Sequence, residues 1–546
     1  MNIAHIHDEA AQRGIHLYLE NQRLRYRADP GAMDAYMREL LANHKAALIA
    51  YLSQLDALRM QAGPTLGPVV PVTERGPVRP SYGQEQLMFL DQLNSGKSNY
   101  NIPLVYRVRG PLDRKALRIA FAMLLERHEI LHARFLERDG EPYLEIAPPG
   151  ELPFHVVDLR CEQAPEDAVI ALANQDAARR FDIARDVLVR ITVAQLADDE
   201  HVLMINTHHI VSDGWSIGIF MGELAALYNS CVAGEANPLK PLPVQYRDYA
   251  VWQRQLLDGA PFQQLLGYWK KQLDGLAPGL NLPFDAPRDA AGSYQAGDVQ
   301  RVVDAELSGA AHRLCKRLNI TLFMLLQSVL SVLLSRYSGD TDIPIGTAVA
   351  GRSQGETEGL IGFFVNTVVL RSDLSGDPSF IELAERNRRM ILAGFAHQQL
   401  PFPLMVEELN PARNTGSSPF FQVMLILQNN AGGGVTFQDL ALEKMGQNPS
   451  VNKFDIELDV TDAHGRLYIG WTYNAALYSA GSAQRMAANF EQLLRSVVAE
   501  PEARISALPL LAAAERDTLL HDWNRTDLPY DGAPTLAALF EARYRR

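Results

Sequence analysis

The chain has 546 residues, of which 47% are hydrophobic and 21% charged, a composition typical of globular proteins and not of disordered, collagenous or coiled-coil chains. Its formal net charge of −13 argues against a dedicated nucleic-acid-binding protein, because neutralising phosphates requires a basic surface. The cysteines Cys161, Cys231 and Cys315 lie far apart without a CxxC pair. This excludes a disulfide framework or a thiolate zinc site and fits a reducing, cytoplasmic environment.

Residues 1–60 are predicted to form a small separate module. Two extended runs within His16–Tyr26 are separated by three polar residues, which predicts a hairpin, and an apolar face at helical spacing follows it. Arg23, Arg25 and Arg27 alternate with apolar residues, so a strand there would present all three on one face. That face is either a solvated strand surface or a docking surface for an acidic peptide.

The rest of the chain is predicted to contain a linker and two lobes. Residues 61–80 hold five prolines and three glycines, which predicts a semi-extended tether and not a packed element. Helical and strand patterns then mix, and a second Pro/Gly-rich stretch at 275–297 divides them into halves of similar size. Two α/β lobes joined by a crossover, 81–270 and 271–511, are the simplest arrangement.

No segment predicts a signal peptide or a membrane span. The N-terminus lacks a cationic stretch followed by an apolar one. The longest apolar run, Thr321–Leu334, is interrupted by Gln327, Ser328 and Ser331 and is too short to cross a bilayer. A cytoplasmic protein without membrane or nucleic-acid partners is expected.

His128–His132 (HEILH) formally matches the HExxH pattern, in which two histidines on one helix bind zinc. The preceding helix is already ending there, however, and no partner helix supplies a third ligand. A polar helix C-terminus is the alternative interpretation, and no metal site is expected. The sequence also lacks the glycine-rich phosphate loops GxxxxGK[ST] and GxGxxG.

A more specific motif, HHIVSDG, occupies His208–Gly214 directly after an apolar strand. A strand-to-loop junction can expose an imidazole at a rigid sheet edge, and histidine titrates near neutrality, as a general base requires. Asp213 could orient the loop through an ion pair, and Gly214 permits a tight turn into the next helix. A pair of buried structural histidines is the alternative.

HHIVSDGWS resembles the HHxxxDG signature of condensation domains in nonribosomal peptide synthetases, which chloramphenicol acetyltransferase-like enzymes share more loosely. Further segments resemble the other motifs of that family in order, across 81–511. Gly83 stands where the family usually has alanine, and His132 where it usually has arginine, which argues against zinc. The matching segments are SYGQEQLMFLDQL from Ser81, RHEILHARF from Arg127, YRDYAVWQ from Tyr246, Gly351-Arg352, IGFFVNT from Ile361, HQQLPF from His397 and RNTGSSPFFQVMLILQN from Arg413.

The resemblance implies an α/β fold of two chloramphenicol acetyltransferase-like lobes in a V shape with a central tunnel, preceded by a small α+β docking domain. It implies an acyltransferase that joins a donor thioester to an acceptor aminoacyl thioester, each carried on the phosphopantetheine arm of a carrier protein. His209 would then be the base or the group that positions the amine, and His208 would be structural. Asp213 would pair with Arg352, and the Gly214 amide could stabilise an oxyanion.

The resemblance extends to both ends of the chain. Residues 1–60 resemble docking domains that bind an acidic C-terminal peptide of an upstream synthetase subunit, and 512–546 resemble the start of an adenylation domain in cis. Elongation with an L-configured donor is favoured. The alternatives are a starter domain that acylates the first amino acid, with coenzyme A as a possible carrier, an epimerisation domain, and a non-catalytic recruiting module.

Overall fold

The protein is described by a computed structural model. It describes residues 6, 10, 15–20, 23–28, 33–45, 47–49, 63–64, 66–73, 76–93, 100–148, 150–288, 295–411, 418–428, 436–446, 454–527 and 535–545.

The N-terminal module contains the predicted hairpin. Strands β1 (Ile15–Glu20) and β2 (Arg23–Ala28) are antiparallel, and helix α2 (Ala35–Asn43) follows. Apolar residues of both parts, including Ile15 and Met37, form a small core of their own. Arg25 is exposed on β2, whereas the side chains of Arg23 and Arg27 lie outside the described residues.

The described part of the predicted tether is extended, as expected, but from Gly67 onward it is packed on the first lobe, so the prediction of an unpacked tether is wrong there. Val69 is buried in the core of the first lobe. The backbone of this segment is held along one helix: Asp248 Oδ1 accepts from Val72 N at 2.9 Å, and Trp252 Nε1 donates to Gly67 O at 3.0 Å. Prolines keep the segment extended, and its backbone groups are satisfied by side chains of this helix and, at Val78, by an antiparallel bridge to Leu144.

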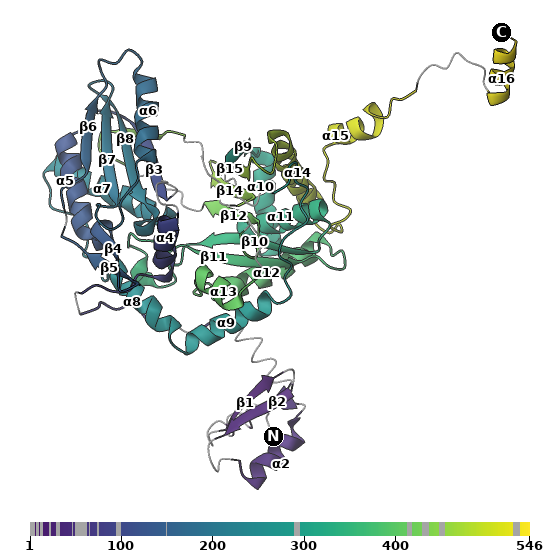
Figure 1. Ribbon diagram of the computed structural model, residues 1–546, viewed down its shortest axis with the longest axis horizontal. Helices are drawn as coiled ribbons and strands as arrows, with labels where there is room; N and C mark the ends of the chain where they lie inside the picture. Colours follow the sequence, from purple (N-terminus) through teal and green to yellow (C-terminus); the bar gives the residue numbers. More distant parts are fainter. Residues whose placement is uncertain are drawn as a thin grey trace.

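The first lobe is a five-stranded sheet, in the order β13-β3-β8-β7-β6, with helices on both faces (Figure 1). Helices α5 and α7 pack against each other over one face, and α6 lies against β3 and β8 on the other. Its elements are α4 (Tyr82–Leu93), β3 (Asn101–Arg109), α5 (Arg114–Arg127), η1 (Glu129–His132), β4 (Ala133–Arg138), β5 (Glu141–Ile146), β6 (Phe154–Asp158), α6 (Pro165–Ala178), β7 (Val189–Gln195), β8 (Glu200–His208), η2 (His209–Val211), α7 (Gly214–Ala233) and α8 (Tyr246–Leu257).

The second lobe is a six-stranded sheet, in the order β11-β10-β12-β14-β15-β9, with its own large core. Helix α11, from the longest apolar run of the sequence, is buried at the centre of that core. The elements are α9 (Ala260–Gln272), β9 (Ala296–Val302), α10 (Ala305–Leu318), α11 (Leu322–Ser338), β10 (Asp342–Val349), η3 (Gly355–Thr357), β11 (Asn366–Asp373), α12 (Phe380–Ala396), α13 (Phe402–Leu409), β12 (Val423–Gln428), β13 (Ala441–Lys444), β14 (Ile456–Ala463), β15 (Arg466–Asn474) and α14 (Ala480–Ala499).

The two lobes are confirmed, but the boundaries 81–270 and 271–511 do not separate them cleanly. Strand β13 pairs with β3 and so completes the sheet of the first lobe. Leu360, Ile361 and Phe364 are also buried in the core of the first lobe. Short segments of the second half of the chain therefore pack on the first lobe. Figure 1 shows the same closeness at α4 of the first lobe, which lies beside the start of β11.

Helix α7 has the length and composition of a membrane span, and α10 with α11 would form a second span only across a 103° bend. In this fold α7 packs on α5, and Phe220 and Leu224 contribute to the lobe core. At the end of the chain, α15 (Ala513–Asp517), η4 (Thr518–Asp522) and α16 (Leu536–Tyr544) contain no buried residue. The V shape and the tunnel stay predictions.

Candidate active site

The HHIVSDG motif lies between the end of the central strand of the first-lobe sheet and the N-terminus of a helix. His208 is the last residue of β8, and η2 begins with His209. Asp213 caps α7, accepting from Ser216 N at 2.8 Å. A buried strand on one side and a capped 20-residue helix on the other therefore fix the ends of a short loop.

The His209 side chain is half-buried, and a hydrogen bond fixes its tautomer. Its Nδ1 lies 2.8 Å from Ser212 O. Because a carbonyl oxygen only accepts, Nδ1 carries the proton, and Nε2 keeps the lone pair. This is the tautomer in which Nε2 can receive a proton or accept a hydrogen bond from an amine.

His208 has the opposite arrangement. Its Nδ1 accepts a hydrogen bond from Ile210 N at 3.2 Å, so the ring proton is on Nε2. The ring is buried between Tyr100 and Phe181, with centroid distances of 6.2 Å to each. Burial lowers the pKa of His208 to about 3, and the neighbouring His209 and Arg180 add to the shift. His208 is therefore a neutral, structural imidazole at physiological pH.

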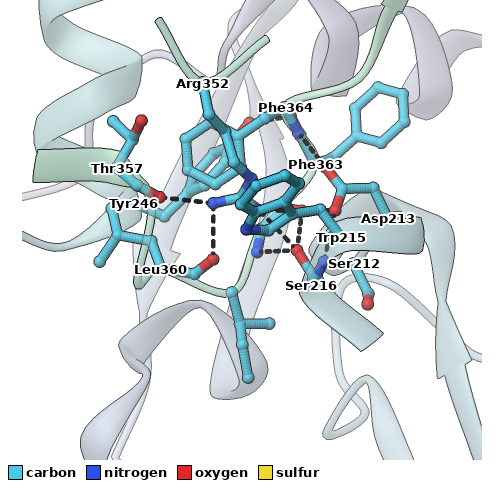
Figure 2. A network of polar contacts seen from close by, with 12 residues as sticks. Ser212, Asp213, Trp215, Ser216, Tyr246, Arg352, Thr357, Leu360, Phe363 and Phe364 are labelled. Carbon is cyan, nitrogen blue, oxygen red and sulfur yellow. Dashed lines mark hydrogen bonds and ion pairs between the residues drawn. The ribbon is translucent and has the colours of Figure 1, made fainter. Parts of the chain in front are cut away.

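Asp213 belongs to a buried polar network that holds segments from both halves of the chain together (Figure 2). Its Oδ2 accepts from Phe364 N at 2.9 Å, and Arg352 Nη2 lies 3.4 Å from Oδ1. This is the ion pair that the family resemblance implied, and both side chains are almost fully buried. The carboxylate therefore accepts hydrogen bonds from the Ser216 amide at the helix cap, from the Phe364 amide and from the Arg352 guanidinium.

Besides Asp213, the Arg352 guanidinium contacts two backbone carbonyls, a hydroxyl and an aromatic ring. Nη1 donates to Thr357 O at 2.5 Å and Leu360 O at 2.8 Å, and Nη2 donates to Ser216 Oγ at 2.8 Å. The guanidinium carbon also lies 3.9 Å from the centroid of the Phe364 ring. Burial lowers the pKa of Arg352 from its usual range, and Asp213 opposes that change. For Arg352 to make these contacts, the backbone of the preceding residue, Gly351, must lie close to the backbone of Phe364.

Gly351 permits that approach. Its φ is +66°, a conformation that L side chains rarely adopt, and a Cβ there would lie 2.0 Å from Phe364 O. The Gly-Arg pair quoted from the sequence therefore works as a unit: the glycine brings the chain against Phe364, and the arginine reaches Asp213.

Two residues of this network were not predicted as site residues. Ser216 Oγ donates to Gly362 O at 2.8 Å and accepts from Gly362 N at 3.0 Å. The buried hydroxyl of Tyr246 donates to Phe363 O at 2.5 Å. Tyr246 begins the YRDYAVWQ motif, and Ser216 lies two residues beyond HHIVSDG. Their positions in or beside these motifs were the sequence feature that could have identified them.

Gly214 is the first residue of α7 and is exposed, with no atom within 4 Å of the place where a Cβ would be. The first amides of an α-helix have no carbonyl partner within the helix. Its N–H is therefore in a position typical of groups that stabilise negative charge.

The HEILH segment forms no metal site. His128 Nε2 is 2.6 Å from Glu223 Oε2, while His132 Nδ1 is 2.5 Å from Ala147 O, so the two rings have separate partners. The helix ends at Arg127, before the motif. Across the part of the chain that the structure describes, no three His, Cys, Asp or Glu residues are placed to hold a metal ion.

Comparisons with known proteins agree with this architecture. The family model described as Condensation domain matches residues 77–520, and that of the TubC N-terminal docking domain matches 3–54. One subunit of the linear gramicidin synthase of Brevibacillus parabrevis is 39% identical over 533 residues, 96% of this chain but 7% of that protein. Malpinin synthetase of Mortierella alpina is 36% identical over 497 residues, 91% of this chain and 6% of that protein. The chain thus spans less than a tenth of the length of these two curated relatives.

Solved structures show the same fold. The X-domain from teicoplanin biosynthesis has a TM-score of 0.74 and 27% identity, covering 82% of this chain and all of that one. The first condensation domain of the calcium-dependent antibiotic synthetase, solved with a substrate analogue, has a TM-score of 0.67 and 19% identity, covering 80% of this chain and 99% of that one. On these matches, the chain belongs to the condensation-domain family of nonribosomal peptide synthetases, amide-forming acyltransferases whose substrates are tethered to carrier proteins by phosphopantetheine, and it begins with a docking domain.

Proposed function

We propose that this chain forms the amide bond between a donor aminoacyl or peptidyl thioester and an acceptor aminoacyl thioester, as an elongation domain for L-configured donors. The observation that carries the proposal is the tautomer of His209, with Nδ1 bonded to Ser212 O and the lone pair on Nε2. An amine nucleophile must lose a proton as it attacks, and Nε2 is suited to receive it or to hold the amine in line.

The reaction balances without a cofactor. The acceptor nitrogen attacks the donor carbonyl carbon, the C–N bond forms, and the C–S bond breaks. One amine proton leaves the nitrogen, and the departing thiolate of the donor arm takes up a proton. His209 acts at the nitrogen, as the base or as the group that positions the amine, and the N–H of Gly214 is the proposed donor to the carbonyl oxygen as negative charge develops.

Asp213 and Arg352 support this site without touching the reacting atoms. Their ion pair fixes the N-terminus of α7 against the segment around Phe364. The loop that carries His209 is therefore held between two segments far apart in sequence, and such rigid support is what a positioned base requires.

We further propose that the partners are an upstream and a downstream carrier protein, an acidic C-terminal peptide bound at Arg23, Arg25 and Arg27, and an adenylation domain in cis. The proposed units are the docking domain (1–60), the linker (61–80, packed on the first lobe from Gly67 onward), the two lobes (81–270 and 271–511, apart from the crossing segments) and the start of the adenylation domain (512–546). The balanced charge of residues 1–60, seven Lys/Arg against seven Asp/Glu, supports a local basic stripe in an acidic protein. A cytoplasmic location also stays a prediction.

The test is single-turnover amide formation with purified carrier proteins loaded with L-aminoacyl donors and acceptors, followed by mass spectrometry of the carriers. Elongation predicts an acceptor-bound dipeptide from a carrier-bound L-aminoacyl donor. A product formed only from an acyl group on coenzyme A or an acyl carrier would instead show a starter domain. No product from either donor would favour a recruiting module, which the same fold also permits, since the teicoplanin X-domain was solved in a complex with OxyB.

A further inference from the structure

The ring of Phe363 packs directly against the His209 imidazole. The two ring centroids are 5.1 Å apart and the planes are nearly perpendicular, at 87°. Phe363 lies between η3 and β11, about 150 residues beyond His209 in sequence, and it packs on the core of the first lobe. A side chain from the second half of the chain thus forms one wall for the imidazole.

The backbone around Phe363 has little freedom to move. Gly362 is bonded through both its N–H and its carbonyl to Ser216 Oγ, and the carbonyl of Phe363 accepts from Tyr246. The next amide, Phe364 N, donates to Asp213 at 2.9 Å. Because three consecutive residues are hydrogen-bonded to buried side chains, the Phe363 ring can change place mainly through its own χ angles.

On the side of α4, the ring of Phe363 meets Gly83. A Cβ built on Gly83 would lie 2.7 Å from Phe363 Cε1 and 3.0 Å from Cδ1, closer than carbon atoms normally approach. Gly83 is the second residue of α4, where a helix gains stability from alanine rather than glycine. Packing therefore explains the glycine: without a Cβ, Gly83 leaves the space that the Phe363 ring occupies.

We propose that Phe363 is a positioning residue that holds the His209 ring against Ser212, and that Gly83 provides the space for it. This proposal rests on the proposed function of His209. Both residues also line a cavity of about 100 Å³ between α4 and the start of β11, so the ring has room to swing away from His209 when it is displaced. Displacement of the ring would free the imidazole to turn away from the Ser212 carbonyl.

The test is a double-mutant cycle of Gly83→Ala and Phe363→Leu, measured by single-turnover amide formation at saturating and half-saturating acceptor. Gly83→Ala is expected to lower the saturating rate by about tenfold to a hundredfold, since misplacing a catalytic group by about 1 Å costs that much. The acceptor concentration for half-saturation should stay unchanged. The double variant should be no slower than Phe363→Leu alone, because the smaller side chain removes the clash. Gly267→Ala, at an exposed helical glycine with nothing within 4 Å of its Cβ position, is the matched control.

A second measurement separates this proposal from the function itself. The ¹⁵N shifts of the His209 ring report its tautomer, and both single variants should change it from the Nδ1–H form to a mixture. Rates and ¹⁵N shifts like those of Gly267→Ala would overturn the proposal, as would fully additive rate losses. If His209→Ala leaves amide formation intact, the proposed function fails, while the ¹⁵N shifts still decide whether Phe363 positions the ring.

Discussion

His208 and His209 are adjacent, but each makes a different hydrogen bond to the backbone, and this gives their rings different protonation. His208 Nδ1 accepts from Ile210 N, whereas His209 Nδ1 donates to Ser212 O, so the two rings hold opposite tautomers. The motif in the sequence located both residues, and the family resemblance implied that His208 is the structural one. The motif could not give the tautomers, because these depend on the directions of an amide and a carbonyl that only the folded loop fixes.

The low pKa of His208 predicts a pH-dependent stability. Its pKa is about 3 in the folded chain and about 6.5 when unfolded, so between these values the unfolded state binds the extra proton. The stabilisation is complete above about pH 6.5 and is lost as the pH falls. His208→Asn, whose Oδ1 can still accept from Ile210 N, should remove this dependence. Urea unfolding from pH 7 to 4.5 should show the wild type losing stability relative to the variant by up to about 1.4 kcal/mol per pH unit. Parallel pH profiles would show that His208 does not titrate in this way.

Asp213→Asn should destabilise the fold by about 3–5 kcal/mol, because it leaves the Arg352 guanidinium buried without its counter-charge. Asparagine can still cap α7 through its one carbonyl oxygen, but its amide nitrogen cannot accept from Phe364 N, so the loss combines the ion pair with that hydrogen bond. Chemical denaturation of Asp213→Asn, Arg352→Met and the double variant should give a coupling energy of about 1 kcal/mol or more. A stable Asp213→Asn protein that forms no amide would instead place Asp213 in the chemistry.

At the scale of elements, helices and strands with a regular hydrophobic pattern were predictable, whereas the short segments of the second half that pack on the first lobe were not. The hairpin at β1–β2 and the helices α5, α7 and α11 follow from local alternation or helical periodicity. Strand β13 is only four residues long, Ala441–Lys444, with none of them buried, and it joins β3 by backbone pairing. Such a strand has no hydrophobic pattern, so nothing local distinguishes it from a loop.

The crossing segment should nevertheless contribute strongly to stability through Phe437. This side chain is 2% exposed and packs on Tyr228 of α7, with ring centroids 5.5 Å apart. Phe437→Ala should cost about 3–5 kcal/mol in urea unfolding and expose residues 436–446 to limited proteolysis. Phe89→Ala, at a phenylalanine that is 59% exposed, is the control and should change stability by less than about 0.5 kcal/mol. Equal effects of the two substitutions would mean that the crossing segment is not anchored by Phe437.

At the scale of the whole molecule, the two halves of the chain contribute residues to one site, although each lobe has its own core. His209 and Asp213 come from the first half of the chain, and Arg352 and Phe363 from the second. The sequence indicated the two lobes, and the family resemblance indicated the pairing of Asp213 with Arg352. Neither indicated that the segment around Gly67 and Val72 packs along α8, because its Pro/Gly content is the same in a free tether and in an extended segment bound to a helix.

The docking module predicts a charge-dependent contact between synthetase proteins. Reversing Arg23, Arg25 and Arg27 to glutamate should weaken binding of an acidic peptide at least about tenfold in fluorescence anisotropy, because it replaces attraction by repulsion. The matched control reverses Arg38 and Lys45, exposed residues of the same module outside β2. Unchanged affinity in the triple variant, or an equal loss in the control, would refute a docking surface on β2.

The most direct test of the central claim is single-turnover amide formation by His209→Ala, with pre-loaded donor and acceptor carrier proteins. The proposed role predicts a rate lower by about 10²–10⁴-fold, the usual contribution of a positioned base, in a protein with the wild-type unfolding midpoint. His208→Asn should keep most of the rate, because its ring is buried and neutral. A His209→Ala protein that forms dipeptide at close to the wild-type rate would contradict the account.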